Sequence, residues 1–200
     1  MIDRRTRGIG ATTAILAAGR IAVTLFVLCI SAPASRPDPA EPPLRASYLV
    51  TVADDFVVDV YLNGKRVPDS KRTMLEERFG ATTERVDVAV RRGDWLVFNV
   101  VNNRLRWGGA RYFAVAGCFA TNEFGFVSDS DSKQWSACDD AGAAPRFIAR
   151  RAYRSQSGIQ AINNPWPDGD GLMRQYAGAS WNGTPVWGHA RSTWVKLRVD

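Results

Sequence analysis

The chain has 200 residues, of which 46% are hydrophobic and 23% charged, and its formal net charge at pH 7 is +6. Four basic residues lie in the first 34 positions, so residues 35–200 keep 22 Lys and Arg against 19 Asp and Glu, a net charge of only +3. These basic residues are scattered among acidic ones and form no basic stripe, which argues against a nucleic-acid partner. The 166 remaining residues suit one domain with a real hydrophobic core.

The first 34 residues have the pattern of a secretory signal. A basic lead precedes an apolar run of ten residues at 21–30, and Ala32 and Ala34 then occupy the small-residue positions of a cleavage site. The run is too short to span a bilayer comfortably, and a longer membrane anchor would be interrupted by Arg20. We therefore expect a signal peptide over 1–34 and a secreted, periplasmic or extracellular protein. Membrane contact is expected only through the uncleaved signal segment.

Two cysteines, Cys118 and Cys138, remain after this segment. An even pair in an oxidising compartment predicts a disulfide, and the alternative is two unpaired buried thiols. With the single histidine, His189, they have no spacing typical of a zinc site.

Five of the ten prolines fall between residues 32 and 43, a composition typical of an extended tether. We expect a Pro-rich linker over 35–45, followed by a single domain over 46–200.

Short runs of alternating apolar residues predict the strands of this domain. The clear runs lie near 47–53, 56–63, 84–91, 95–101, 111–117 and 193–199. Alternation places on one face Phe56, Val58, Val60 and Leu62 in the second run, Leu96, Phe98 and Val100 in the fourth, and Val195, Leu197 and Val199 in the last. Asn63-Gly64 is the strongest kind of tight-turn signal, so a hairpin is expected there.

Only 70–80 has a pattern that predicts a helix, with Ser or Asp before it and a terminal glycine. Residues 118–190 are less periodic and rich in Gly, Ser, Asn and Trp, which predicts long loops, where function often resides. The fold class expected is all-β, an antiparallel β-sandwich of jelly-roll type with long loops and at most one or two short helices. The tryptophans in these loops either seal the core or stack on a ligand.

Three segments in order carry a family resemblance: VADDFVVDVYLNGKRV (52–67), VDVAVRRGDWLVFNVVNN (86–103) and GGARYFAVAG (108–117). Their succession of Asp-Asp, alternating strand, Asn-Gly turn, strand ending in Asn and Gly-rich loop resembles the galactose-binding-like β-sandwich of carbohydrate-binding modules. The resemblance covers roughly 46–117. It implies a secreted, non-catalytic, lectin-like module whose partner is a glycan or a cell-surface polysaccharide.

The resemblance also implies a site. Asp54 and Asp55 are similar to the adjacent aspartates of flocculin-type sugar-binding domains, which hold calcium near the sugar, so both are candidate ligand-binding residues and calcium is the candidate cofactor. The loop after the strand near 95–101 offers Asn103 and Arg106 as hydrogen-bond donors and Trp107 for stacking. The alternative for the two aspartates is that they end a turn through their own backbone.

Other chemistry has weaker signals. Asp129 with Asp131, and Asp168 with Asp170, have the alternate spacing of calcium loops, but neither pair continues as an EF-hand, so both are expected to be surface turns. His189 has no nucleophile elbow to serve, and no pair of acids forms a recognisable glycosidase motif. Two alternatives stay open: a secreted hydrolase acting on glycans or esters, and a structural cell-envelope protein tethered by its Pro-rich arm.

Overall fold

The computed structural model describes residues 41–200 except 79, 103–110, 122, 156–158 and 160–167. Residues 40–200 form one compact unit. No helix in the described part of the chain is both long and apolar enough to cross a membrane.

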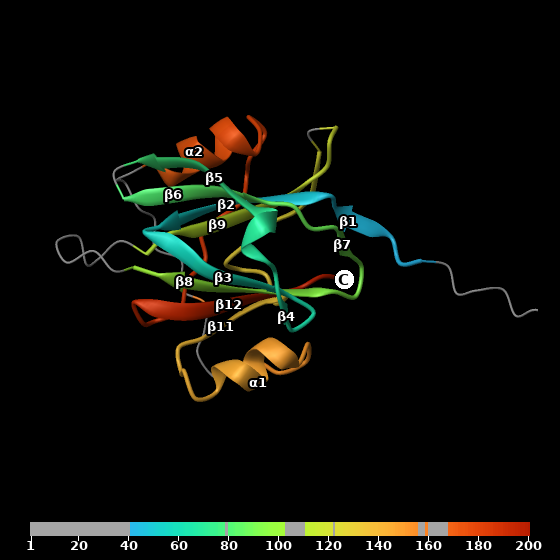
Figure 1. The fold of residues 1–200 in the computed structure, drawn as a ribbon, viewed down its shortest axis with the longest axis vertical. Helices are drawn as coiled ribbons and strands as arrows, with labels where there is room; N and C mark the ends of the chain where they lie inside the picture. Colours follow the sequence, from blue (N-terminus) through green and yellow to red (C-terminus); the bar gives the residue numbers. More distant parts are fainter. Residues whose placement is uncertain (1–40, 79, 103–110, 122, 156–158, 160–167) are drawn as a thin grey trace, which may run out of the picture. The chain divides into compact units, whose positions relative to one another are not determined.

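Two five-stranded antiparallel sheets make up the unit (Figure 1). The first has the strand order β10 (Phe124–Val127), β9 (Phe113–Cys118), β2 (Tyr48–Asp54), β6 (Ala81–Val86) and β5 (Arg72–Arg78). The second has the order β11 (Trp135–Cys138), β12 (Ser192–Arg198), β8 (Trp95–Val101), β3 (Phe56–Leu62) and β4 (Lys65–Arg66). The short strands β1 (Leu44–Ala46) and β7 (Val90–Arg91) pair separately, and a 3-10 turn, η1 (Asp69–Lys71), precedes β5. The expected antiparallel β-sandwich is confirmed.

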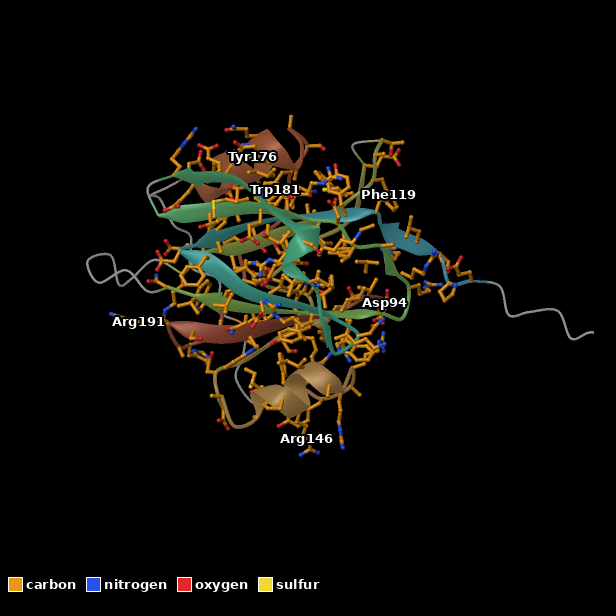
Figure 2. All side chains as sticks on the ribbon, in the orientation of Figure 1. Asp94, Phe119, Arg146, Tyr176, Trp181 and Arg191 are labelled. Carbon is orange, nitrogen blue, oxygen red and sulfur yellow. The ribbon has the colours of Figure 1, made fainter. Side chains whose placement is uncertain are left out.

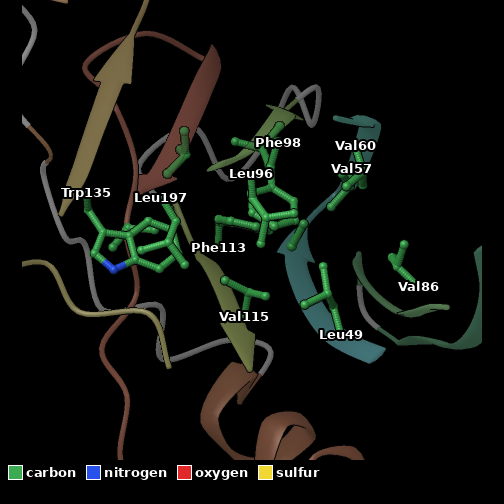
Figure 3. Close-up of a cluster of buried hydrophobic side chains, with 14 of the residues drawn as sticks. Leu49, Val57, Val60, Val86, Leu96, Phe98, Phe113, Val115, Trp135 and Leu197 are labelled. Carbon is green, nitrogen blue, oxygen red and sulfur yellow. The ribbon is translucent and has the colours of Figure 1, made fainter. Parts of the chain in front are cut away.

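The two sheets face each other across one hydrophobic core (Figure 3). Phe98 of β8 and Phe113 of β9 meet in it with ring centroids 4.9 Å apart. The predicted inward faces of 95–101 and 193–199 are confirmed, because all six of their apolar members belong to this core: Leu96, Phe98, Val100, Val195, Leu197 and Val199. The prediction succeeded because the apolar residues on the core face recur at every second position in both strands, although the opposite face of each strand is packed as well.

One short helix covers the outer face of each sheet (Figure 1). Helix α2 (Gly169–Tyr176) packs with Leu172 and Met173 on the first sheet, against the outward side chains of β2 and β9. Helix α1 (Ala144–Ala149) packs with Phe147 on the second sheet. The central strands are therefore buried on both faces, and both helices lie in the region where long loops were expected.

Lys196 of β12 is fully buried beneath α1. Its ammonium donates hydrogen bonds of 2.9 Å to the carbonyls of Arg150 and Tyr153 and lies 4.0 Å from the centroid of the Phe147 ring. Both carbonyls belong to the segment that leaves α1, so this one side chain anchors the segment to the sheet. Burial lowers the pKa of Lys196 from 10.5 to about 8, because desolvation disfavours the charged form.

The helix predicted over 70–80 is wrong, since Arg72–Arg78 forms the edge strand β5, paired with β6. An edge strand alternates weakly because much of it faces solvent, and here its cross-strand pairing overrides its helix propensity.

The predicted face of 56–63 is also partly wrong. Val57 and Val60 lie in the core, whereas Phe56 is 41% exposed. The cause is an irregularity in the pairing of β3 with β8 between Val57 and Asp59, which shifts the alternation by one residue.

Arg72 uses the carbonyls at this irregularity to join the two sheets. Its guanidinium donates to the carbonyls of Val57 and Val58 at 2.5 and 2.8 Å, and forms an ion pair of 2.7 Å with Glu84 of β6. Both charged side chains are only 11% exposed. Arg72 lies on β5 of the first sheet and β3 belongs to the second, so these two hydrogen bonds join the sheets at the side of the sandwich formed by β4 and β5. The ion pair with Glu84 of the neighbouring strand β6 holds the Arg72 side chain in place.

The predicted disulfide is not formed in the structure, where Cys118 and Cys138 are free and buried. Cys118 belongs to the apolar cluster beneath α2 and Cys138 to the cluster beneath α1. The two thiols therefore lie on opposite outer faces of a sandwich whose sheets are about 10 Å apart, whereas a disulfide needs Cα atoms within about 7 Å. Burial raises the pKa of Cys118 to about 11.

The segment between α2 and β12 buries two tryptophans. Val186 and Trp187 belong to the main core, and the amide of Val186 donates to the carbonyl of Phe113 at 2.8 Å. Trp181 lies on the α2 side of the sandwich, near Tyr176, and belongs to the cluster beneath the helix (Figure 2). These tryptophans seal the fold.

Candidate functional site

Asp55 alone connects β2 of the first sheet to β3 of the second. It has a φ of +69°, a left-handed conformation that Asp tolerates better than most residues. Its amide donates to the carbonyl of Gly80 at 2.7 Å, and its carbonyl accepts from the hydroxyl of Thr82. Asp54 and Asp55 are only 8% and 4% exposed, so this corner is part of the packed structure.

The corner contacts the two described residues that flank the predicted ligand loop, Asn102 and Tyr112. Asn102, directly after β8, donates through its side-chain amide to the Asp54 carboxylate at 2.9 Å. On the far side of the loop, the carbonyl of Tyr112 accepts from the amide of Asp54 at 2.7 Å. Both ends of the β8–β9 connection therefore meet the corner, at one end of the sandwich.

Three of the predicted binding residues, Asn103, Arg106 and Trp107, lie outside the described residues. Calcium takes six to eight oxygen ligands. Within the described ranges, no group of three or more His, Cys, Asp or Glu side chains could hold a metal ion. The binding roles of all five residues stay predictions, while the burial and hydrogen bonds of Asp54 fit the alternative, a structural turn.

A groove of about 600 Å³ lies elsewhere, between β10 and the segment after α2. Its lining residues are Glu123, Phe124, Phe126, Val127, Ser180 and Asn182, which we call the β10 groove. Phe124 packs on the cluster beneath α2 and Phe126 on the main core, and both rings are half-buried. The rings are therefore held in place while part of each remains accessible.

The spacing of these two phenylalanines depends on the glycine between them. A Cβ on Gly125 would lie 1.5 Å from the carbonyl oxygen of Arg45, because β1 crosses the strand at this point. The β9–β10 pairing is irregular between Phe124 and Phe126, which re-aims the side chains there. Sequence reasoning missed this groove, and the only signal was the FGF triplet itself.

The other acidic pairs have structural roles. Asp168 caps α2 by accepting from the amide of Gly171 at 2.8 Å, so the expectation of a surface turn there is wrong. Asp170 accepts from the hydroxyl of Tyr112 at 2.7 Å, and burial of that tyrosine raises its pKa. Asp129 accepts from the amide of Asp131 at 2.9 Å in a surface turn, as expected.

His189 is exposed, and it is its backbone amide that donates to Asp139, at 2.8 Å. No hydrogen-bond partner of its imidazole occurs in the part of the chain that the structure describes. Within the described ranges, no catalytic triad is assembled around His189.

Comparisons of the chain with family models, with curated proteins and with solved structures find no match. The resemblance to galactose-binding-like and flocculin-type domains therefore has no support from these comparisons, and the structure bears out only the β-sandwich. A fold of this kind carries many unrelated functions.

Proposed function

We propose that the protein is a secreted, non-catalytic module that binds a glycan or a cell-surface polysaccharide. The observation that carries the proposal is the β10 groove, where Phe124 and Phe126 lie beside Ser180, Asn182 and Glu123. Aromatic faces stack on the apolar faces of sugar rings, while hydroxyl, amide and carboxylate groups exchange hydrogen bonds with sugar hydroxyls. The resemblance to galactose-binding-like sandwiches supports the same class of ligand.

The half-buried state of the two rings matters for affinity. Each ring is fixed by packing on its buried side, so little side-chain entropy is lost when a sugar stacks on it. The exposed side chains of Ser180 and Asn182 then supply orientation.

The corner at Asp54 is a second candidate location in this proposal. It accepts a hydrogen bond from Asn102, next to the loop that carries Asn103 and Trp107, so it would position that loop. Calcium held by Asp54 and Asp55 would make binding there sensitive to a chelator.

A glycan array followed by calorimetry, each with and without calcium, tests the proposal. We expect binding without turnover, and about fivefold weaker binding for Phe124→Ala and for Asn182→Ala, since loss of one stacking or hydrogen-bonding contact costs about 1 kcal/mol. Asp131→Asn, which changes an exposed acid in another turn, is the matched control.

Two results would contradict the assignment of the glycan site to the β10 groove. The first is full affinity in both groove variants together with loss of binding in Asp54→Asn and on chelation of calcium. This result would show that the glycan binds at the Asp54–Asp55 corner. Hydrolysis of a glycan or ester that His189→Ala abolishes would favour the hydrolase alternative over a binding module.

A further inference from the structure

A separate cavity of about 390 Å³ lies at the β3–β4 hairpin and η1, on the side of the sandwich away from β10. Its lining residues are Leu62, Asn63, Lys65, Arg66, Val67, Pro68, Lys71, Asp87 and Val88, which we call the β4 pocket. Its volume falls in the range of small-molecule sites, roughly 300–1,000 Å³.

The walls of the pocket are fixed before any ligand binds. The Asn63 side chain donates to the carboxylate of Asp94 at 2.7 Å and accepts from the amide of Trp95 at 3.0 Å. The amide of Val67 donates to the carbonyl of Val60 at 2.8 Å. A preformed wall reduces the ordering cost of binding.

The floor of the pocket is apolar. Val67 is buried in the main core, and Leu62 and Val88 are half-buried against it. A ligand on this floor therefore covers aliphatic surface that is continuous with the core. It gains free energy from this contact only if its own body is apolar.

The mouth of the pocket is positively charged once its ion pairs are accounted for. Arg66 forms ion pairs with two carboxylates, Asp59 at 2.5 Å and Asp69 at 2.8 Å, so this group of three side chains carries a net charge of −1. Asp87 is neutralised by Arg85 at 2.8 Å.

Lys65 and Lys71 are exposed and have no carboxylate partner among the residues that the structure describes. Lys65 and Lys71 outweigh the surplus carboxylate of the Asp59–Arg66–Asp69 group, so the charges named here sum to +1 around the opening.

We propose that the β4 pocket binds a small amphiphilic anion. The apolar body of the ligand lies on Leu62, Val67 and Val88, and its carboxylate or sulfonate group lies between Lys65 and Lys71. The lining offers a sugar no aromatic ring on which to stack, and the aliphatic floor favours a ligand with an apolar body. The proposal is independent of glycan binding, since it shares no residue with the β10 groove.

The test uses 8-anilinonaphthalene-1-sulfonate as an anionic probe and N-phenyl-1-naphthylamine as its uncharged counterpart, both followed by fluorescence on the folded protein. We expect one saturable site for the anionic probe. The double variant Lys65→Gln/Lys71→Gln weakens binding of that probe about tenfold and leaves binding of the uncharged probe unchanged. Lys133→Gln, an exposed lysine on another loop, is the matched control and changes neither.

Competition and a filling variant locate the probe. Val88→Phe, which narrows the pocket, weakens both probes. Dodecanoate or 1-naphthoate displaces the anionic probe, and the stronger competitor distinguishes an acyl from an aromatic acid. Phe124→Ala leaves both probes unaffected, which separates this test from that of the glycan site.

Three outcomes would overturn the proposal. The first is unchanged affinity for the anionic probe in the double lysine variant. The second is failure of both acids to displace the probe. The third is a shift of sedimentation coefficient in the pocket variants without a change in probe affinity, which would mean that a second copy of the chain covers the pocket.

Discussion

Asp55 is the one residue by which the chain passes from the first sheet to the second. A left-handed conformation costs a non-glycine residue roughly 1–2 kcal/mol. The hydrogen bonds of its amide with Gly80 and of its carbonyl with Thr82 offset this cost. The neighbouring Asp54 is buried by the same corner, and its carboxylate is held by Asn102. The two adjacent aspartates thus have different roles, since one makes the turn and the other joins it to β8.

The first prediction concerns the carboxylate of Asp54. Asp54→Ala removes the buried hydrogen bond from the Asn102 side-chain amide to a carboxylate, and a hydrogen bond to a charged group contributes about 1.5–3 kcal/mol. We expect the free energy of unfolding, measured by urea denaturation, to fall by this amount. The control Asp131→Ala, at an exposed acid, changes it by less than about 0.5 kcal/mol. Unchanged stability in Asp54→Ala together with loss of glycan binding would show that Asp54 serves a ligand.

At the scale of single elements, α1 has only six residues, too few to be stable by itself. What holds its end to the sheet is Lys196, through two carbonyls and one aromatic face. A buried ammonium is an unusual anchor because it must be desolvated, and its lowered pKa is the measure of that cost.

The second prediction follows from this lysine. Between its folded pKa of about 8 and its ordinary 10.5, the unfolded chain binds more protons at this site than the folded chain. The contribution of Lys196 to stability therefore rises as pH increases from 8 to 10.5. We expect the difference in unfolding free energy between the native protein and Lys196→Met to shift in favour of the native protein over this window.

The pH dependence of the native protein alone is not sufficient for this test, because other groups change the unfolding free energy in the opposite direction over the same range. Burial raises the pKa of Cys118 to about 11, so its contribution to stability falls above its ordinary pKa. This effect is common to both proteins and cancels. A difference that does not change with pH would mean that Lys196 titrates at its ordinary value in the folded protein.

At the scale of the whole molecule, the third prediction concerns the link between the sheets. Arg72→Met leaves the Glu84 carboxylate unpaired in a site that is only 11% exposed, and breaking a buried pair in this way costs about 3 kcal/mol or more. The double variant Arg72→Met/Glu84→Gln should lose less, because no uncompensated charge remains.

The matched control for this prediction is Arg78→Met, which removes the more exposed ion pair with Glu76 and should cost less than about 1 kcal/mol. The free energy of unfolding of each variant is measured by urea denaturation. Equal losses in Arg72→Met and Arg78→Met would contradict a role for Arg72 in joining the sheets.

Much of the sandwich could be predicted from the sequence because its central strands alternate cleanly. In the strand Trp95–Val101, Leu96, Phe98 and Val100 recur at every second position and occupy the core face, while Trp95 and Val97 belong to the cluster beneath α1. The prediction of the inward-facing residues failed where an irregularity in strand pairing interrupts the alternation of side chains between the two faces. The irregularity in β3 moves Val57 into the core, and the edge strand β5 faces solvent too much to show a period. The prediction of a disulfide was wrong because the number of residues between two cysteines does not show on which face of a sandwich each one lies.

The candidate sites separate for a similar reason. The Asp54–Asp55 pair is visible in the sequence because its members are adjacent, although adjacency did not reveal their burial. The β10 groove joins Phe124 to Asn182, which are far apart in the chain and come together only through the packing of α2 and its following segment on β10. The charge at the mouth of the β4 pocket depends on which of its charged side chains form ion pairs. These pairs follow from the three-dimensional structure and cannot be predicted from the order of residues in the sequence.

The turn at Asn63-Gly64 has a consequence for chemical ageing. Asparagine before glycine is the pair most prone to deamidation, in which the following backbone nitrogen attacks the side-chain amide. Here both atoms of that amide are held, by Asp94 and by the amide of Trp95, so the folded protein resists the attack while a loosened hairpin does not. Deamidation would place a new carboxylate against Asp94, and the repulsion would open the hairpin that forms one wall of the β4 pocket. In stored preparations we therefore expect the β3–β4 hairpin to be among the first parts of the fold to open. Mass spectrometry would detect the small mass increase that accompanies conversion of the Asn63 amide to an acid.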